Sequence, residues 1–196
     1  MGPFKLTNST DTYGAVSRIL HWGMAIAIFA MFALGLWMRT LDYYSPWYQQ
    51  APNIHKSIGI ILLALLVLRL IWRLANVQPD DSHLKPIERR ISKATHWAFY
   101  AILFALMVSG YFISTVDGRA IDVFDWFAVP SIYVQKGLED TFGIIHEYLA
   151  YLVMALAGIH AAAALKHHFY DRDITLRRMW SGRSTRPYTS IDPERN

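Results

Sequence analysis

The sequence predicts an all-α membrane protein, a four-helix bundle with both termini in the cytoplasm. Four segments are long and apolar enough to cross a hydrocarbon layer about 30 Å thick, which takes about 20 residues of helix. None of them carries the polar face that a helix of a water-soluble bundle presents to solvent. Basic residues are also divided unequally between the two sides of this layer. The predicted spans are Ile19–Met38, Ile54–Trp72, Trp97–Val116 and Phe142–Leu165.

The distribution of Lys and Arg predicts the orientation of the bundle. Of the 19 Lys and Arg residues, only Arg39, Lys56, Arg119 and Lys136 fall on the side that the first span reaches at its end. The positive-inside rule therefore places both termini in the cytoplasm. Because membrane orientation accounts for the basic C-terminal tail, we expect the lipid bilayer as a partner and no nucleic acid.

The chain divides into three parts by composition. Residues 1–16 form a polar N-terminal segment, residues 17–170 a membrane domain of four helices, and residues 171–196 a basic cytoplasmic tail. The two connections on the outer side, residues 40–53 and 117–141, are rich in aromatic residues. We expect both connections to lie at the outer membrane interface, where Trp and Tyr are favoured.

Each of the four spans has a histidine at one of its ends. His21 and His96 lie at the cytoplasmic starts of the first and third spans, and His55 lies at the outer start of the second. The fourth span carries both His146, near its outer end, and His160, near its cytoplasmic end. Ionisable residues inside membrane spans are functional candidates by default, because burying them in lipid is costly.

The depths of these histidines predict two pairs across antiparallel helices. On the fourth span His146 and His160 are 14 residues apart, which is about 21 Å of helix and about 40° short of four turns, so they share a face. His21 lies at the depth of His160, and His55 at the depth of His146. One pair of imidazoles is therefore expected in each leaflet.

The absence of cysteine restricts the chemistry of these pairs. With no cysteine, the chain has no disulfide, no thiolate cluster and no covalent attachment of c-type haem. Two imidazoles can instead hold the iron of a noncovalent haem b, leaving no open position for dioxygen. Two such haem b groups stacked across the bilayer would carry electrons through it. The metal ligands predicted in this way are His21, His55, His146 and His160.

The spacing of 14 residues recurs on the other spans. It relates His21 to Gly35 and His96 to Gly110, which places both glycines level with the outer pair. We expect these glycines to let a flat macrocycle approach the helix backbone. It also relates His55 to Arg69, which could bind a haem propionate or simply extend toward the interface. We expect His96 to lie beside the inner haem without being a ligand.

Basic residues at the cytoplasmic end of the fourth span have two interpretations. Lys166, His167 and His168 follow one another there. They could complement the helix dipole and the lipid phosphates. Alternatively, His167 and His168 could donate hydrogen bonds and protons to a quinone head group close to the inner haem.

Four short motifs resemble those of the bacterial cytochrome b561 family, which consists of four-helix, di-haem membrane cytochromes. The resemblance extends over roughly residues 12–180 and implies the four histidine ligands and their pairing given above. It also implies a multi-pass protein of the bacterial inner membrane. The motifs are R-x-x-H-W at Arg18–Trp22, I-H-K-S-I-G at Ile54–Gly59, I-H-E at Ile145–Glu147 and H-A-A-A-A-L-K-H-H-F at His160–Phe169.

The resemblance leaves more than one function open. One branch of the family is similar to a superoxide oxidase that passes electrons from periplasmic superoxide to ubiquinone. Another branch, with a first loop like residues 41–52 of this chain, accompanies a periplasmic lipocalin-like protein. The loop of residues 117–141 has five acidic and two basic residues, which disfavours an anionic substrate and suits a protein partner. A haem-free transporter is disfavoured because the histidines lie near the membrane surfaces and not at the midplane.

Overall fold

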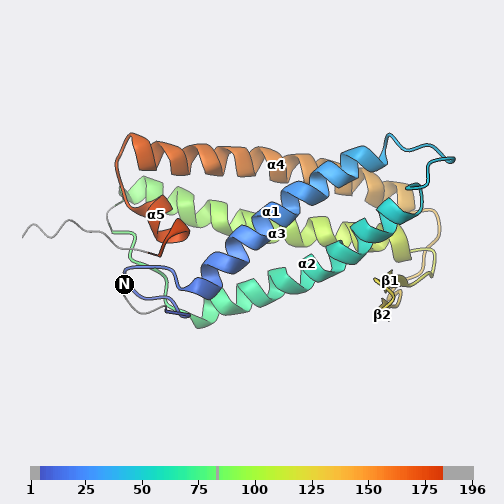
Figure 1. Ribbon diagram of the computed structural model, residues 1–196, viewed down its shortest axis with the longest axis horizontal. Helices are drawn as coiled ribbons and strands as arrows, with labels where there is room; N and C mark the ends of the chain where they lie inside the picture. The colour runs from blue at the N-terminus through green and yellow to red at the C-terminus, as the bar shows by residue number, and fades with distance from the viewer. Residues whose placement is uncertain (1–4, 83, 183–196) are drawn as a thin grey trace, which may run out of the picture.

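The protein is an all-α bundle of four long antiparallel helices in a computed structural model that describes residues 5–82 and 84–182 (Figure 1). All four are long and apolar enough to cross a membrane, which confirms the predicted fold class. We call the end where α1 and α3 begin the inner end, and the opposite end the outer end. The long helices are α1 (Ala15–Met38), α2 (Gln50–Ala75), α3 (Pro86–Thr115) and α4 (Glu139–Phe169).

Each helix is longer than the span that hydropathy predicts. The helices have 24 to 31 residues, or about 36–46 Å of helix, so their polar ends reach beyond the hydrocarbon layer. The difference is largest for α3, which begins at Pro86 where the prediction began at Trp97. Pro86 occupies the first turn, and the carboxylate of Glu88 accepts a hydrogen bond from the backbone N–H of Lys85 at 3.1 Å. These capping contacts allow α3 to begin within a polar segment.

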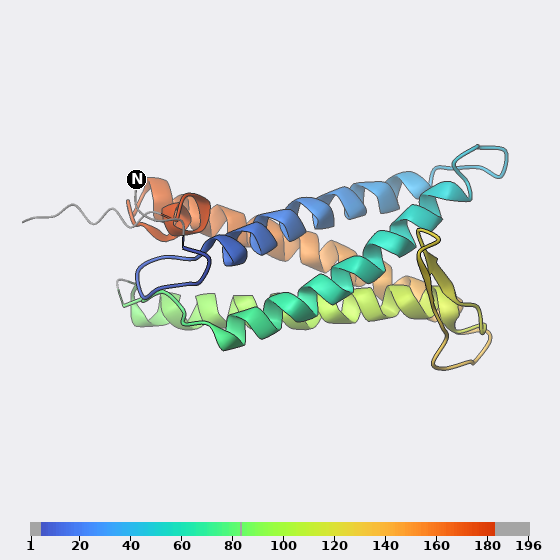
Figure 2. The same ribbon diagram turned by 60° about the horizontal axis from the view of Figure 1, so that its bottom comes forward.

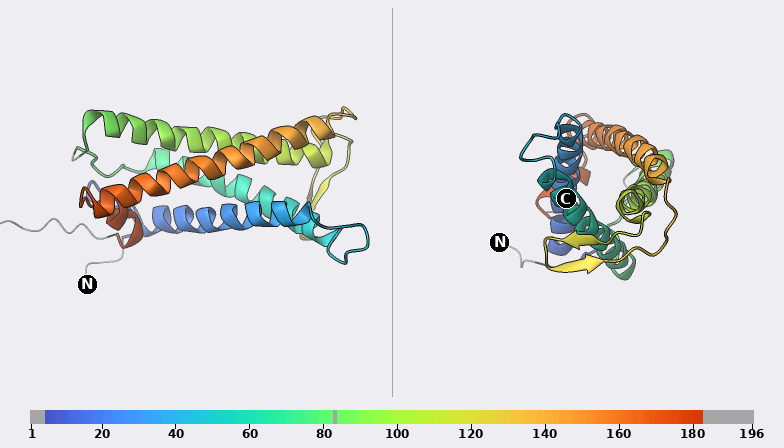
Figure 3. Two further views of the ribbon diagram at one scale, coloured as in Figure 1. Left: turned by 90° about the horizontal axis from the view of Figure 1, so that it is seen from above. Right: turned by 90° about the vertical axis from the view of Figure 1, so that its right-hand side faces the viewer.

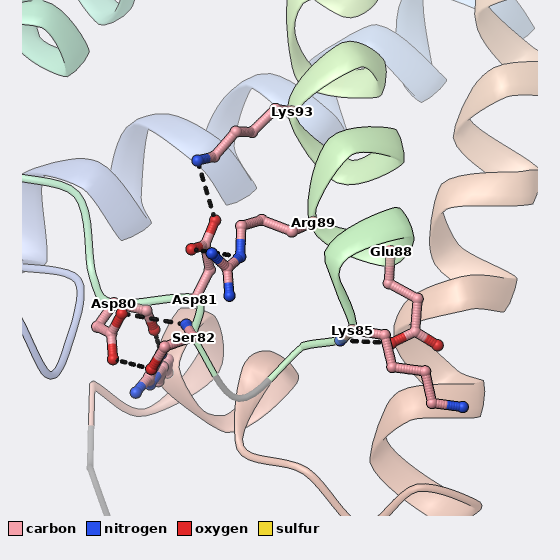
Figure 4. A network of polar contacts seen from close by, with 8 residues as sticks. Asp80, Asp81, Ser82, Lys85, Glu88, Arg89 and Lys93 are labelled. Atoms are coloured by element: carbon pink, nitrogen blue, oxygen red, sulfur yellow. Dashed lines mark hydrogen bonds and ion pairs between the residues drawn. The ribbon is translucent and has the colours of Figure 1, made fainter.

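A polar network fixes the connection between α2 and α3 at the inner end (Figure 4). The carboxylate of Asp81 binds Arg89 at 3.2 Å and Lys93 at 3.5 Å, both from the first turns of α3. The preceding carbonyl, that of Asp80, accepts a hydrogen bond from Nη1 of Arg178 at 2.6 Å. The connection is therefore held against both α3 and the chain that follows α4.

The four long helices share a small apolar core and turn most of their apolar surface outward. Each of them contributes to one buried cluster, which is surrounded by half-buried apolar side chains. Large side chains such as Ile26 on α1 and Ile159 on α4 are 68% exposed, as expected of surfaces that face lipid. The buried cluster consists of Met24, Leu62, Leu66, Leu103 and Val153.

The outer connection between α3 and α4 contains a β-hairpin that the sequence analysis did not predict. Strand β1 (Ile121–Val123) pairs antiparallel with β2 (Phe127–Val129), and the hairpin lies beside the outer ends of α2 and α3 (Figure 2). Phe124 and Asp125 turn the chain with φ of 49° and 58°. Ile121 and Val123 are buried, so the inward face of β1 packs on the bundle. This part of the connection therefore packs on the helices as well as lying at the outer end.

A short helix, α5 (Thr175–Trp180), lies at the inner end on the same side of the molecule as the N-terminal segment (Figure 1). Its backbone carbonyls accept hydrogen bonds from α1. Trp22 Nε1 donates to the Met179 carbonyl at 3.1 Å, and Arg18 Nη1 donates to the Trp180 carbonyl at 3.2 Å. The predicted tail of residues 171–196 thus begins with an ordered helix. Residues 1–4 of the predicted N-terminal segment and 183–196 of the tail lie outside the described residues.

The view along the bundle shows the long helices around one axis, with the hairpin on one side, next to α2 (Figure 3). In this arrangement α1 packs on α2, α2 on α3, and α3 on α4. Side chains from all four helices can therefore meet at one depth.

Candidate functional site

A cavity of about 610 Å³ opens between the helices in the outer half of the bundle. This volume lies within the range of pockets that hold small organic ligands and cofactors. All four long helices and the start of the hairpin contribute to its wall. The lining includes Gly35, His55, Gly110, Ile121 and His146.

The outer histidines, His55 on α2 and His146 on α4, both line this cavity and lie next to each other. Their ring centroids are 6.2 Å apart and the rings are inclined by 72°. Nδ1 of His146 lies 2.9 Å from the backbone carbonyl of Leu106, so this nitrogen carries the proton and donates it. Nε2 of His146 then keeps a lone pair, as a metal ligand requires.

The imidazole of His55 has an unsatisfied nitrogen. Its Nδ1 is buried and has no hydrogen-bond partner among the residues that the structure describes. Buried polar atoms without partners are rare and mark strain or an additional group at the site. Together with the cavity and the free Nε2 of His146, this unsatisfied atom makes the outer pair a fit for a haem held by two imidazoles.

The two predicted glycines lie directly against the outer histidines. A Cβ at Gly35 would lie 3.5 Å from Cε1 of His55, an ordinary contact. A Cβ at Gly110 would lie 2.9 Å from Cε1 and 3.1 Å from Nδ1 of His146, which is closer than real Cβ atoms approach. The sequence placed both glycines at the depth of the outer pair, and in the structure their nearest neighbours are the imidazoles themselves.

Charged side chains surround the outer part of the cavity. Arg39 at the end of α1 forms an ion pair with Glu147 of α4, and both line the cavity. Arg119 also lines it, with Nε 2.5 Å from the carboxylate of Asp117. Lys56 lines it from α2. The charge distribution places Arg39, Lys56 and Arg119 on the outer side, and in the structure all three line the cavity.

The inner histidines are arranged differently. The ring of His160 lies 5.6 Å from that of His96 and 5.5 Å from that of Phe99, both on α3. Nδ1 of His21 lies 2.8 Å from Nη2 of Arg69. The two predicted inner ligands, His21 and His160, thus each pack against another side chain.

The contact with Arg69 determines the tautomer of His21. A guanidinium can only donate hydrogen bonds, so Nδ1 of His21 accepts and Nε2 carries the proton. Ligation of iron by Nε2 would require Arg69 to leave Nδ1. Haem binding by His21 through Nε2 therefore requires a change in its contact with Arg69.

Arg69 also borders a small polar cavity at the inner end. This cavity of about 30 Å³ has room for a water molecule, and Tyr13, Arg73 and Tyr100 line it beside Arg69. The guanidinium lies 6.0 Å from the centre of the Tyr100 ring. The structure thus places Arg69 at the depth of the inner histidines, as its spacing from His55 predicts.

The predicted quinone residues lie at the inner end of α4. Nδ1 of His167 is 2.8 Å from the carboxylate of Asp171 and 3.4 Å from that of Asp173. Lys166 Nζ, 2.7 Å from Asp171, holds the pKa of that carboxyl below its ordinary value. His168 packs on Phe169, and its buried Nδ1 has no hydrogen-bond partner within the described part of the chain.

The contacts of His167 with Asp171 and Asp173 were not predicted from the sequence. The spacing of four residues between His167 and Asp171 is the signal that could have indicated their contact.

Residues 5–82 and 84–182 contain no group of three or more His, Cys, Asp or Glu placed to hold a metal ion. Two-imidazole ligation of haem needs no such group, because the macrocycle supplies the remaining ligands.

Comparison with known proteins agrees with a haem-binding membrane protein. The family model of prokaryotic cytochrome b561 matches residues 12–182 of the chain. The chain is 47% identical to cytochrome b561 homolog 2 of Escherichia coli over 184 residues, which cover 93% of the chain and 97% of the relative.

Two more distant relatives also match over most of their length. The chain is 28% identical to the probable superoxide oxidase CybB of Yersinia pestis, with 85% of the chain and 94% of the relative covered. It is 24% identical to cytochrome b561 homolog 1 of Escherichia coli, with 82% and 92% covered. The chain therefore belongs to the prokaryotic cytochrome b561 family and is a multi-pass protein of the bacterial inner membrane that transfers electrons with haem b.

Proposed function

We propose that this cytochrome carries electrons between the two membrane surfaces through two stacked haem b groups, each held by two histidines. His55 and His146 hold the outer haem, and His21 and His160 hold the inner one. The observation that carries this proposal is the outer cavity, because His55 and His146 both line this cofactor-sized space and their ring centroids are 6.2 Å apart.

The continuous helix α4 supports the stacking of two centres. His146 and His160 lie on one unbroken helix of 31 residues, so their Cα atoms are about 21 Å apart along its axis. Haem b supplies one-electron redox chemistry when bound, and the protein fixes where each centre lies. A carrier with one centre near each surface shortens the electron path across the bilayer.

At the inner end, we propose that the carrier exchanges electrons with ubiquinone. Reduction of a quinone to a quinol takes two electrons and two protons. The imidazole of His167 is held by Asp171 and Asp173 at the inner end of α4, where it can exchange protons with the surrounding water. His168, adjacent in sequence, is a second candidate donor to the quinone oxygen.

At the outer end, we propose superoxide as one electron donor. Oxidation of superoxide releases dioxygen and one electron, which the outer haem would accept. A relative that is 28% identical is named a probable superoxide oxidase. Lys56, Arg39 and Arg119 all line the outer cavity and would attract an anion. Two of these three cations are paired with carboxylates, which weakens the attraction.

The exposed hairpin favours a second candidate function. Trp126 is 74% exposed, and Asp122 and Asp125 beside it are also exposed. Exposed aromatic and acidic side chains together suit docking of a periplasmic protein. In this alternative the cytochrome is a membrane anchor that exchanges electrons with a partner, such as the lipocalin-like protein implied by the first loop.

Haem analysis of single histidine variants tests the two-haem proposal. We expect about two haems per chain in the purified protein and two distinguishable α-bands in the reduced-minus-oxidised spectrum. His160→Ala should remove one band, and His146→Ala should remove the other. If each variant kept both bands at full intensity, the assignment of the ligands would be wrong.

Stopped-flow reduction separates the two candidate functions. Reduction of the haem by superoxide at a rate above that with quinol alone would support the oxidase. A rate unaffected by superoxide, with normal reduction by quinol, would leave the anchor as the better proposal.

A further inference from the structure

We propose that one turn of α3, residues 106–110, is a positioning element for the outer haem although it supplies no ligand. This turn contacts the imidazole of His146 from α4 through a carbonyl, a hydroxyl and a glycine, and we call it the α3 seat. The inference rests on the proposed function, because it assigns the reason why the His146 ring is ready to bind iron.

The first part of the α3 seat is a pair of oxygens that face the same ring nitrogen. Nδ1 of His146 lies 2.9 Å from the carbonyl oxygen of Leu106 and 3.2 Å from the hydroxyl oxygen of Ser109. The Ser109 hydroxyl donates its own proton to the Leu106 carbonyl at 2.7 Å. The hydroxyl oxygen is therefore free to accept, so both oxygens can receive the single Nδ1 proton of His146.

These contacts fix both the tautomer and the orientation of the ring. With the proton held on Nδ1, the lone pair remains on Nε2, the nitrogen that would bind iron. Ser109 is only 4% exposed, so water does not compete for its hydroxyl. Hydrogen bonding at the nitrogen remote from the metal also increases the basicity of the ligand, and basicity affects the reduction potential of the iron.

The second part of the α3 seat is Gly110, which has no side chain. A Cβ at Gly110 would lie 2.9 Å from Cε1 and 3.1 Å from Nδ1 of His146. Only glycine therefore allows the ring to lie against α3 with its Nδ1 proton on Leu106. The sequence analysis gave Gly110 a role toward the macrocycle, and the structure adds a role toward the ligand.

Substitution of glycines provides a matched test. Gly110→Ala should reduce the haem content from about two per chain to about one, with loss of the outer-haem band and retention of the inner one. Alanine favours a helix over glycine, so a loss of haem cannot be attributed to a weakened α3. Gly158→Ala on α4 is the control, because a Cβ there has nothing within 4 Å.

Retention of both bands and both potentials in Gly110→Ala would overturn the inference, and so would loss of a haem in Gly158→Ala.

Substitution of Ser109 tests the hydrogen bonds without a steric change. Ser109→Ala should keep both haems, shift the midpoint potential of the outer haem, and leave that of the inner haem unchanged. Ser109→Thr retains a hydroxyl and should return the potential toward the wild-type value. An unchanged outer potential in Ser109→Ala would overturn the role of the hydroxyl.

The two proposals fail in different ways. A wild-type protein that binds no haem, or binds it without His146, refutes the proposed function. If the wild-type protein binds two haems, and its Gly110→Ala and Ser109→Ala variants have the same spectrum and midpoint potentials, only the α3 seat is refuted.

Discussion

The two outer imidazoles differ in the hydrogen bonding of Nδ1. Nδ1 of His146 donates to a carbonyl, whereas Nδ1 of His55 is buried without a partner among the described residues. A buried polar atom that has lost its water costs about 1–3 kcal/mol of stability. His55 therefore carries a cost to the stability of the fold, which haem ligation by this residue would explain.

His55→Leu tests this cost. We expect the variant to lose the outer haem, because leucine cannot ligate iron. In haem-depleted protein, the same variant should raise the free energy of unfolding by about 1 kcal/mol, since it removes the unsatisfied nitrogen. Thermal unfolding of the two haem-depleted proteins in one detergent measures the difference, with His146→Leu as the comparison that should not stabilise. A haem-depleted His55→Leu less stable than wild type would contradict the prediction.

Arg69 is a charged group that contacts His21, one of the inner histidines. Its guanidinium lies 2.8 Å from His21 and is half-buried, so its charge acts on the site with little screening. A nearby cation favours the reduced, less positive form of a haem. Arg69→Met should therefore lower the midpoint potential of the inner haem and leave the outer potential unchanged. Redox titration followed at the two α-bands measures both values, and a higher inner potential would contradict the expected role.

At the scale of the elements, the hairpin is the part of the fold that completes the outer cavity. Arg119, Ala120 and Ile121 line the cavity at the start of the hairpin. The buried hydroxyl of Ser57, on α2, donates to the carbonyl of Asp122 and accepts from the N–H of Phe124, both at 3.2 Å. One side chain thus attaches the hairpin to α2, two residues after His55.

Ser57→Ala should loosen this attachment. The substitution leaves one carbonyl and one N–H of the hairpin without partners, at a cost of about 1–3 kcal/mol. We expect faster hydrogen exchange at the Phe124 amide, with exchange in the middle of α2 unchanged. Ser45→Ala in the other outer connection is the control, because that residue does not contact the hairpin in the described contacts. Unchanged exchange at Phe124 would show that the apolar contacts of Ile121 and Val123 hold the hairpin by themselves.

The sequence predicted the helices well and the short elements poorly, for a physical reason. Hydropathy reports the match between a segment and the hydrocarbon layer, so it located all four spans. It is insensitive to polar turns, so it missed the first turns of α3 and the whole of α5. The hairpin consists of strands of three residues, too short for a detectable alternation, and its attachment at Ser57 comes from a distant part of the chain.

At the scale of the whole molecule, the depth of each histidine followed from helix direction alone. The contact between the rings of His55 and His146 occurs where antiparallel helices were expected to bring them. The contacts of His21 with Arg69, and of His160 with His96, could not be predicted, because they depend on helix rotation and side-chain rotamers. The ligand roles of these residues and the cytoplasmic location of the termini stay predictions.

The absence of cysteine allows a clean test of orientation. A single cysteine introduced as Tyr44→Cys lies in the outer connection, where the side chain is 91% exposed. A second, Ser82→Cys, lies in the exposed inner connection. In intact cells, a maleimide that cannot cross the membrane should label Tyr44→Cys and not Ser82→Cys, whereas disrupted cells should show both. Labelling of Ser82→Cys alone in intact cells would contradict the predicted orientation.

The hydrogen bonds between α1 and α5 have a consequence for biosynthesis. Trp22 and Arg18 leave the ribosome long before their acceptors at Met179 and Trp180. Until those acceptors are synthesised, the donors must be satisfied by water or lipid head groups. A nascent chain arrested before residue 175 would hold all four spans and still lack the contact between α1 and α5.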